Sequence, residues 1–182
     1  TSNDLICFNM RSCNYLSQFI IALIALCGSL TMSAQESSPR SAGYRGSVTL
    51  TDQYLAIIGF ETSHGYMFNE HHYLGAGVGG FFIPTDNLPC FGQVFADYRA
   101  YLSDKASTMV LGAKAGFCHA FKTNEGNHNG YSFMNAATLE PSLGWIWGGK
   151  NGNGFGISLG GQVFMYKDDV SVLPKLNFFY EF

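Results

Sequence analysis

The chain has 182 residues, of which 47% are hydrophobic and 15% aromatic, so its length suits one domain and its composition excludes a disordered protein. Charged residues make up only 13% and glycine contributes 22 residues, which indicates that much of the surface does not face water and favours strands over helices. The net charge of −3 offers no basic patch and excludes nucleic acid as an expected partner.

The first predicted element is an export signal. Residues 19–32 form a continuous apolar core after Arg11, and this core is shorter than the ~20 residues that span a membrane as a helix. Small residues then precede a polar stretch, which suggests cleavage after Ala34. We therefore expect residues 1–34 to be an N-terminal extension and signal peptide and residues 35–42 a short linker. An uncleaved anchor helix is the alternative.

From residue 43 onward, apolar and polar residues alternate in strand-length segments separated by polar turns, without helical periodicity. The pattern predicts an all-β fold, an eight-stranded antiparallel up-and-down transmembrane β-barrel over residues 43–182. An even number of strands places both termini at one end, where short connections are expected, with longer loops at the other. The predicted strands are 43–51, 55–68, 73–83, 91–102, 108–121, 133–147, 154–166 and 172–182.

The alternation assigns the apolar residues to the outer face, the inverse of a soluble lipocalin-like barrel with its apolar interior. In the last strand, Leu176 and Phe178 share one face while Lys175 and Glu181 share the other. On a lipid face a Lys or Arg would cost roughly 2–4 kcal/mol at mid-membrane. We therefore expect lipid outside and a lumen charge network of four positive and four negative side chains: Arg45, Glu61, Asp97, Arg99, Lys114, Glu140, Lys175 and Glu181.

Aromatic residues gather at the predicted periplasmic ends of the strands. Bands of aromatic side chains at the membrane borders are typical of transmembrane barrels. The expected aromatic girdle consists of Tyr44, Tyr66, Phe68, Trp145, Trp147, Phe155, Tyr180 and Phe182.

One charge cluster is predicted where the barrel closes. Counting across the connection at 52–54 sets Arg45 beside Glu61, and closure of the sheet brings Glu181 near the same rim. A guanidinium with five donors can serve both carboxylates. We therefore expect Arg45 to lie between them, unless the register slips by two residues.

Cys90 and Cys118 lie near the outer ends of consecutive predicted strands, and the same kind of counting brings them within reach of a disulfide. Alternation argues against the bond, because Cys90 would face outward and Cys118 inward. Both alternatives stay open.

The C-terminal residues 176–182 (LNFFYEF) resemble the assembly signal that outer-membrane barrels present to the insertion machinery. Residues 43–46 (GYRG), 62–66 (TSHGY) and 73–79 (YLGAGVG) resemble the family of small OmpX-like outer-membrane barrels of Gram-negative bacteria. The resemblance implies a barrel in the outer membrane after removal of the signal peptide. It implies outer-membrane lipid and the insertion machinery as partners, and little about activity.

An eight-stranded lumen is only wide enough for side chains to fill it, so we predict a plugged barrel and not a diffusion pore. Its role is expected to be structural or to involve an unknown surface partner. Gly75, Gly77, Gly79 and Gly80 are expected to make room for inward Arg or Tyr side chains of neighbouring strands.

Two further alternatives are a soluble lipocalin-like ligand-binding barrel and an outer-membrane lipid hydrolase. The hydrolase would use Glu61, Ser63 and His64. Adjacent strand residues point to opposite faces, however, so Ser63 and His64 cannot readily share a proton. His71 and His72 with Glu70 suggest exposed turn residues more than a metal site. No catalytic residue, cofactor or metal is therefore predicted.

Overall fold

The structure is a computed structural model that describes residues 40–54, 57–83, 90–120, 136–149, 152–166 and 169–182. These residues form one compact unit. The predicted signal peptide and residues 121–135 lie outside the described residues. Among those described, no helix is long and apolar enough to cross a membrane.

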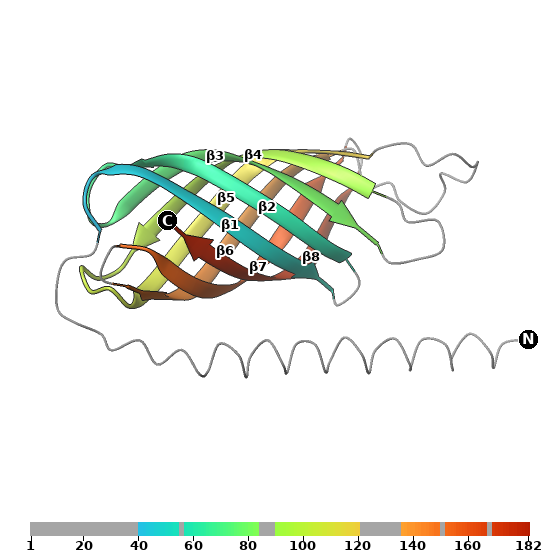
Figure 1. Ribbon diagram of the computed structural model, residues 1–182. Helices are drawn as coiled ribbons and strands as arrows, with labels where there is room; N and C mark the ends of the chain where they lie inside the picture. The colour runs from blue at the N-terminus through green and yellow to red at the C-terminus, as the bar shows by residue number, and fades with distance from the viewer. Residues whose placement is uncertain (1–39, 55–56, 84–89, 121–135, 150–151, 167–168) are drawn as a thin grey trace, which may run out of the picture. The chain divides into compact units, whose positions relative to one another are not determined.

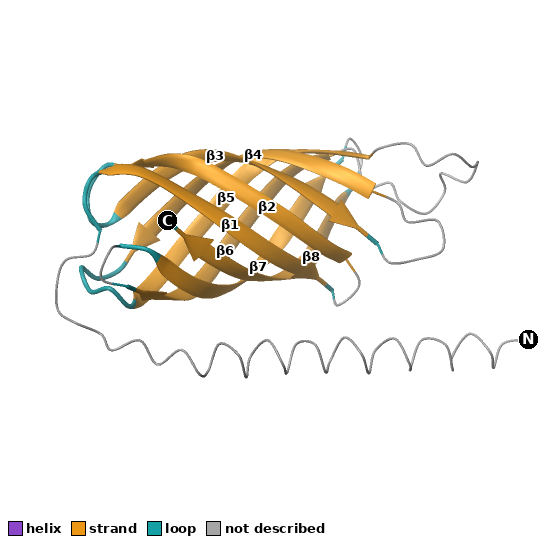
Figure 2. Cartoon of the chain, viewed as in Figure 1, coloured by secondary structure: helices purple, strands orange, loops and turns teal. Residues whose placement is uncertain are grey.

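Eight antiparallel strands form a closed barrel in which each strand pairs with its neighbours in the sequence and β1 closes against β8 (Figures 1 and 2). The predicted eight-stranded up-and-down fold is confirmed, and each strand boundary falls within three residues of the expected one. The strands are β1 (Gly43–Gln53), β2 (Ile57–Met67), β3 (His72–Phe82), β4 (Cys90–Tyr101), β5 (Thr108–Ala120), β6 (Ala136–Gly148), β7 (Gly154–Met165) and β8 (Val170–Glu181).

The two ends of the barrel differ in their connections. The short β2–β3, β4–β5 and β6–β7 connections share one end with Gly43 and Phe182, and we call it the turn end. The other end, the loop end, carries the remaining connections, including the 15 residues between β5 and β6. The expected separation is present only in part, because the β1–β2 and β7–β8 connections of the loop end are as short as those of the turn end.

Alternation along each strand sends successive side chains to opposite faces, as pleated strands require. In β2, Glu61 and Ser63 are buried, whereas Phe60, His64 and Tyr66 are exposed. The same pattern runs through the other strands, so the barrel has an outer face rich in exposed apolar side chains and an interior that holds the buried polar ones.

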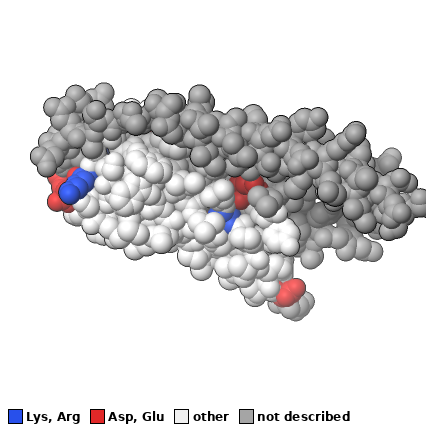
Figure 3. Space-filling view, turned by 90° about the horizontal axis from the view of Figure 1, so that it is seen from below, with Lys and Arg blue, Asp and Glu red and all other residues white. Residues whose placement is uncertain are grey.

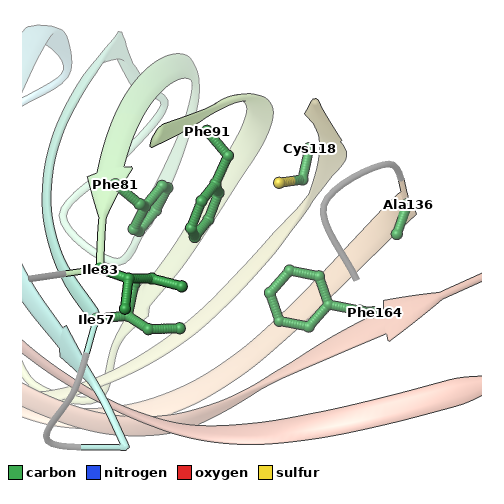
Figure 4. Packing of buried hydrophobic residues seen from close by; sticks show 7 residues of the cluster. All are labelled: Ile57, Phe81, Ile83, Phe91, Cys118, Ala136 and Phe164. Carbon is green, nitrogen blue, oxygen red and sulfur yellow. The ribbon is translucent and has the colours of Figure 1, made fainter. Parts of the chain in front are cut away.

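Apolar side chains fill both ends of the lumen. The loop-end cluster consists of Ile57, Phe81, Ile83, Phe91, Cys118, Ala136 and Phe164, and the rings of Phe81 and Phe91 stack with their centroids 4.9 Å apart (Figure 4). The turn-end cluster consists of Met67, Tyr73, Tyr101, Val110, Ile146 and Phe179. The polar interior therefore lies between two apolar clusters.

Three glycines of β3 make room for interior side chains. A Cβ at Gly77 would lie 2.5 Å from the ring of Phe95 on β4, and one at Gly79 would lie 2.9 Å from Cγ of Glu61 on β2. A Cβ at Gly75 would meet the hydroxyl of Tyr73 on the same strand at 2.2 Å. The expectation of Arg or Tyr side chains from neighbouring strands is therefore wrong in detail, because the residues met are a Phe, a Glu and a Tyr of β3 itself. Gly80 points outward with nothing within 4 Å of its Cβ position.

Candidate functional site

The centre of the lumen holds a closed ring of alternating charge built by Glu61 (β2), Lys114 (β5), Glu140 (β6) and Lys175 (β8). Lys175 Nζ lies 2.5 Å from Glu61 Oε1 and 2.7 Å from Glu140 Oε2. Lys114 Nζ lies 2.5 Å from Glu61 Oε2 and 3.6 Å from Glu140 Oε1. Each carboxylate therefore faces both ammonium groups, and all four side chains are buried.

A second charged group lies nearer the turn end and centres on Arg99. Its guanidinium donates to Asp97 Oδ2 at 2.5 Å, to Glu181 Oε1 at 2.7 Å and to Ser47 Oγ at 2.7 Å. Tyr101 OH also donates to Glu181 Oε1 at 2.8 Å. A planar guanidinium presents several donors in fixed directions, so Arg99 can join three strands at one point.

On the loop-end side of the ring, polar uncharged side chains form a chain across the lumen. Gln53 Nε2 donates to Gln162 Oε1. Gln162 Nε2 donates to Gln93 Oε1 at 2.9 Å, and Gln93 Nε2 donates to Thr138 Oγ1 at 3.0 Å. Donors and acceptors alternate, as buried amides require. The chain links β1, β7, β4 and β6.

A small cavity adjoins both charged groups. Its volume is about 30 Å³, and its lining includes Asp97, Arg99, Lys114, Ser142 and Asn177. A water needs about 10–15 Å³ of such space, whereas pockets for small molecules measure about 300–1,000 Å³. The cavity can therefore hold one or two waters but not an organic ligand.

Arg45 does not lie where the sequence suggested. Thr49 is the residue opposite Glu61, and Ser47 is the residue opposite Glu181. The Arg45 guanidinium instead donates to the carbonyl of Gly152 at 2.6 Å. The expectation that Arg45 lies beside Glu61 is wrong.

The error comes from the turn between β1 and β2. β1 continues through Asp52 and Gln53, and Gln53 pairs with Ile57, so the β1–β2 register is centred two residues later than expected. Moving the centre of a turn by two residues moves every cross-strand partner by four. The polar pair at 52–53 resembled a turn, although Gln53 is a buried strand residue with an interior partner.

Arg40, before β1, supplies a buried charge that sequence reasoning missed. It is 3% exposed, and its Cζ lies 4.6 Å from the centre of the Tyr101 ring. Burial lowers the pKa of Arg40, although a guanidinium stays protonated in proteins. Eight charged side chains are buried among the described residues, four of each sign. This set matches the expected one except that it contains Arg40 and not Arg45. Arg40 precedes the alternating segments, so alternation in the sequence could not indicate that it is buried.

All eight residues of the expected aromatic girdle point outward at the turn end. Tyr44 pairs with Tyr66 across β1 and β2, and Phe155 pairs with both Trp147 and Tyr180 across its two neighbouring strands. Phe68 packs edge-on against Tyr66, and Phe182 stacks against Tyr180. Trp145 lies on the same face, two residues farther from the rim than Trp147. The registers therefore place these rings in a band around part of the rim.

The residues of the hydrolase hypothesis lie on opposite faces of β2. Ser63 is buried and its hydroxyl lies 2.9 Å from the Tyr73 hydroxyl. His64 is exposed, with Nδ1 2.6 Å from Tyr44 OH and Nε2 3.0 Å from Thr62 Oγ1. Glu61 pairs with the lysines of the ring. Ser63 and His64 therefore cannot act as a nucleophile and its base.

The turn histidines contact neighbouring residues separately. His71 Nδ1 lies 2.8 Å from the Tyr101 carbonyl, and its Nε2 lies 2.8 Å from Asp104 Oδ1. His72 Nδ1 lies 2.9 Å from Tyr98 OH. Within the described ranges, no three His, Cys, Asp or Glu side chains are grouped to hold a metal ion.

Cys118 has a free thiol buried in the loop-end cluster. Its cross-strand partner is Gln93, three residues along β4 from Cys90. The side chain of Cys90 lies outside the described part of the chain. The disulfide left open by the sequence is not formed at Cys118.

No protein-family model matches the chain, and no curated protein matches it. Among solved structures, the N-terminal β-barrel domain of OprF from Pseudomonas aeruginosa is similar, with 12% identity over 76% of this chain and 96% of that chain and a TM-score of 0.49. The outer membrane protein Ail of Yersinia pestis, in a phospholipid bilayer nanodisc, is 13% identical over 79% of this chain and 100% of that chain, with a TM-score of 0.48. At such low identities and scores, neither likeness says what this chain binds or does.

Proposed function

We propose that this chain spans the outer membrane, with lipid against its outer face and the charge network closing its lumen, and that its role is structural or in surface interaction. The observation that carries the proposal is where the charges lie. Nine charged residues occur in the eight strands, and all except Asp52 have inward parity. Asp52 lies next to the last residue of β1, at the loop end.

The outer face supports the same proposal. Leu159 is 63% exposed, Phe60 57% and Val94 57%, and exposed apolar side chains occur on every strand. The described surface of the face shown in Figure 3 is largely without charge. Water-soluble monomers rarely expose contiguous apolar patches beyond a few hundred Å². A lipocalin-like barrel would instead place such side chains in the lumen.

The rim and the last strand supply the expected partners. Trp and Tyr prefer the border between hydrocarbon and headgroups, so the aromatic girdle would fix the turn end at the periplasmic interface. The outward Leu176, Phe178 and Tyr180 of β8 would contact lipid and present the signal that the insertion machinery recognises. Even-numbered barrels with short periplasmic turns and longer outer loops are typical of this membrane.

The two tryptophans of the chain test lipid contact, because both point outward. After expression of the full chain in a Gram-negative host, we expect the protein in the outer-membrane fraction. In vesicles with brominated acyl chains, both indoles should be quenched, and bromine placed deeper should act more strongly on Trp145 than on Trp147. Trp145→Phe and Trp147→Phe leave one reporter each. Protein that stays in the soluble fraction, or indoles that bromine does not quench, would contradict the proposal.

Conductance tests the closed lumen separately. The purified protein in planar bilayers should give no steady current steps, because the ring, the amide chain and two apolar clusters occupy the interior. Vesicles that contain the protein should also retain a soluble dye trapped inside them. Stable open channels of uniform size would show that the barrel is a pore.

A further inference from the structure

Residues 40–42, which we call the strap, are the described residues before β1. The Arg40 guanidinium donates to the carbonyls of Ser103 at 3.1 Å, Ala106 at 3.3 Å and Lys105. These carbonyls belong to the β4–β5 connection. Because β1 pairs with β2 and β8, β4 and β5 lie on the opposite wall of the barrel. Arg40 therefore joins the two walls across the mouth of the lumen at the turn end.

The place that receives Arg40 suits a guanidinium. Three carbonyl oxygens accept hydrogen bonds, and the face of the Tyr101 ring lies under the cation. Arginine over an aromatic face with carbonyl acceptors around it is a favourable arrangement. The connection bends at residues 104–107, and within it Lys105 N donates to Ser103 Oγ at 3.3 Å. The site is thus built by the backbone of one turn and one ring.

This contact continues into the charge network. Tyr101, below Arg40, donates to Glu181, and Glu181 accepts from Arg99. Without Arg40, the buried charges of the described residues would comprise four carboxylates and three cations. Among the fully buried charges, the strap therefore supplies the fourth cation, and it does so from outside the strands.

We propose that the strap closes the turn end of the lumen, that Arg40 pins it in the guanidinium site of the β4–β5 connection, and that release of Arg40 opens this end alone. The loop-end cluster shares no residue with the turn-end cluster, so it stays closed when the pin is released. The proposal concerns the folded barrel in micelles or membranes and does not depend on where the protein resides in the cell.

Cysteine accessibility can separate the two ends. Val110 lies opposite Tyr101 and is 5% exposed, so Val110→Cys reports on the turn end. Cys118 is a natural reporter at the loop end. Each reporter is placed alone in the full chain, with the other cysteines replaced by serine. The measurement is the rate of reaction with a charged, water-soluble methanethiosulfonate in detergent micelles.

With Arg40→Ala we expect the rate at position 110 to rise roughly tenfold or more, as the loss of charge-assisted hydrogen bonds predicts. The rate at Cys118 should not change. Lys105→Ala is the matched control, because it removes a nearby exposed cation but keeps the backbone carbonyl that accepts from Arg40, and it should change neither rate. Arg40→Lys should give an intermediate rate at position 110.

Equal rates at position 110 with and without Arg40 would overturn the proposal. So would a parallel rise at both reporters, which indicates general loosening and not an opened end. The heat-modifiable gel shift shows whether each variant is folded. If Arg40→Ala gives no folded band, Arg40→Gln provides the same comparison with a longer side chain.

Discussion

The inner and outer faces of β8 differ in what surrounds their side chains, although inward and outward residues alternate along the strand. Lys175 is fully buried and bonded to two carboxylates, whereas Val172 and Tyr180 on the opposite face are exposed. The inner residues depend on partners from distant strands. The outer residues depend on the medium around the barrel. On one strand, the inward residues therefore depend on one another for stability, whereas the outward residues contribute to it independently.

The difference concerns energy as well as position. Inside, the removal of one charge leaves its buried partners without their counter-charge, and buried unpaired charges are costly. Outside, each apolar side chain contributes according to its own area and depth, so effects should add. Substitutions on the two faces can separate these regimes.

The largest effect is expected from Lys175→Ala. This change leaves Glu61 and Glu140 with Lys114 alone, and breaking a buried pair in this way costs about 3–5 kcal/mol of the free energy of unfolding. Urea titration followed by the heat-modifiable gel shift measures the loss. Lys105→Ala, an exposed lysine of the β4–β5 connection, should stay within about 0.5 kcal/mol of the parent.

The coupling can be tested with the same residue. Lys175→Met combined with Glu61→Gln should be less destabilising than the sum of the two single changes, because each one removes the charge that the other leaves unpaired. Strict additivity, or an unfolding midpoint of Lys175→Ala equal to that of the parent, would show that lumen water solvates these charges.

A smaller effect is expected on the outer face, and it should depend on depth. Leu159→Arg, in the middle of β7, should cost roughly 2–4 kcal/mol, whereas arginine near an interface costs about 0–1 kcal/mol. Leu102→Arg, just past the turn end of β4, is the matched control, since both leucines are more than half exposed. Unfolding in lipid vesicles measures both. Equal costs at the two positions would remove the depth dependence that a membrane imposes.

Alternation was sufficient to predict the strands and the facing of their side chains. Glu140 and Lys175 could be assigned to the interior because each stands between outward apolar neighbours. Their partners could not be assigned, because partners depend on register, and register depends on where the chain reverses. Asp52 and Gln53 have turn-like composition but continue β1, and this misplaced Arg45.

The contacts of Arg40 and of Gln53 form only when the sheet closes into a barrel. Arg40 follows a serine- and proline-containing stretch with no alternation, and its partners are more than 60 residues away. The link from Gln53 to Gln162 joins β1 to β7, strands that meet only through a closed lumen. Neither contact has a local signal in the sequence.

The ring of four charges has a consequence for how the barrel forms. Lys114, Glu140 and Lys175 come from β5, β6 and β8, but Glu61 comes from β2, on the far side of the β1–β8 seam. Until that seam closes, Lys175 has Glu140 as a partner but cannot reach Glu61, so the ring stays incomplete. A half-closed sheet would therefore leave Glu61 and Lys175 with fewer partners than they have in the closed barrel, and such an intermediate would be sparsely populated. The pairing of β1 with β8 and the completion of the charge ring therefore become a single cooperative event.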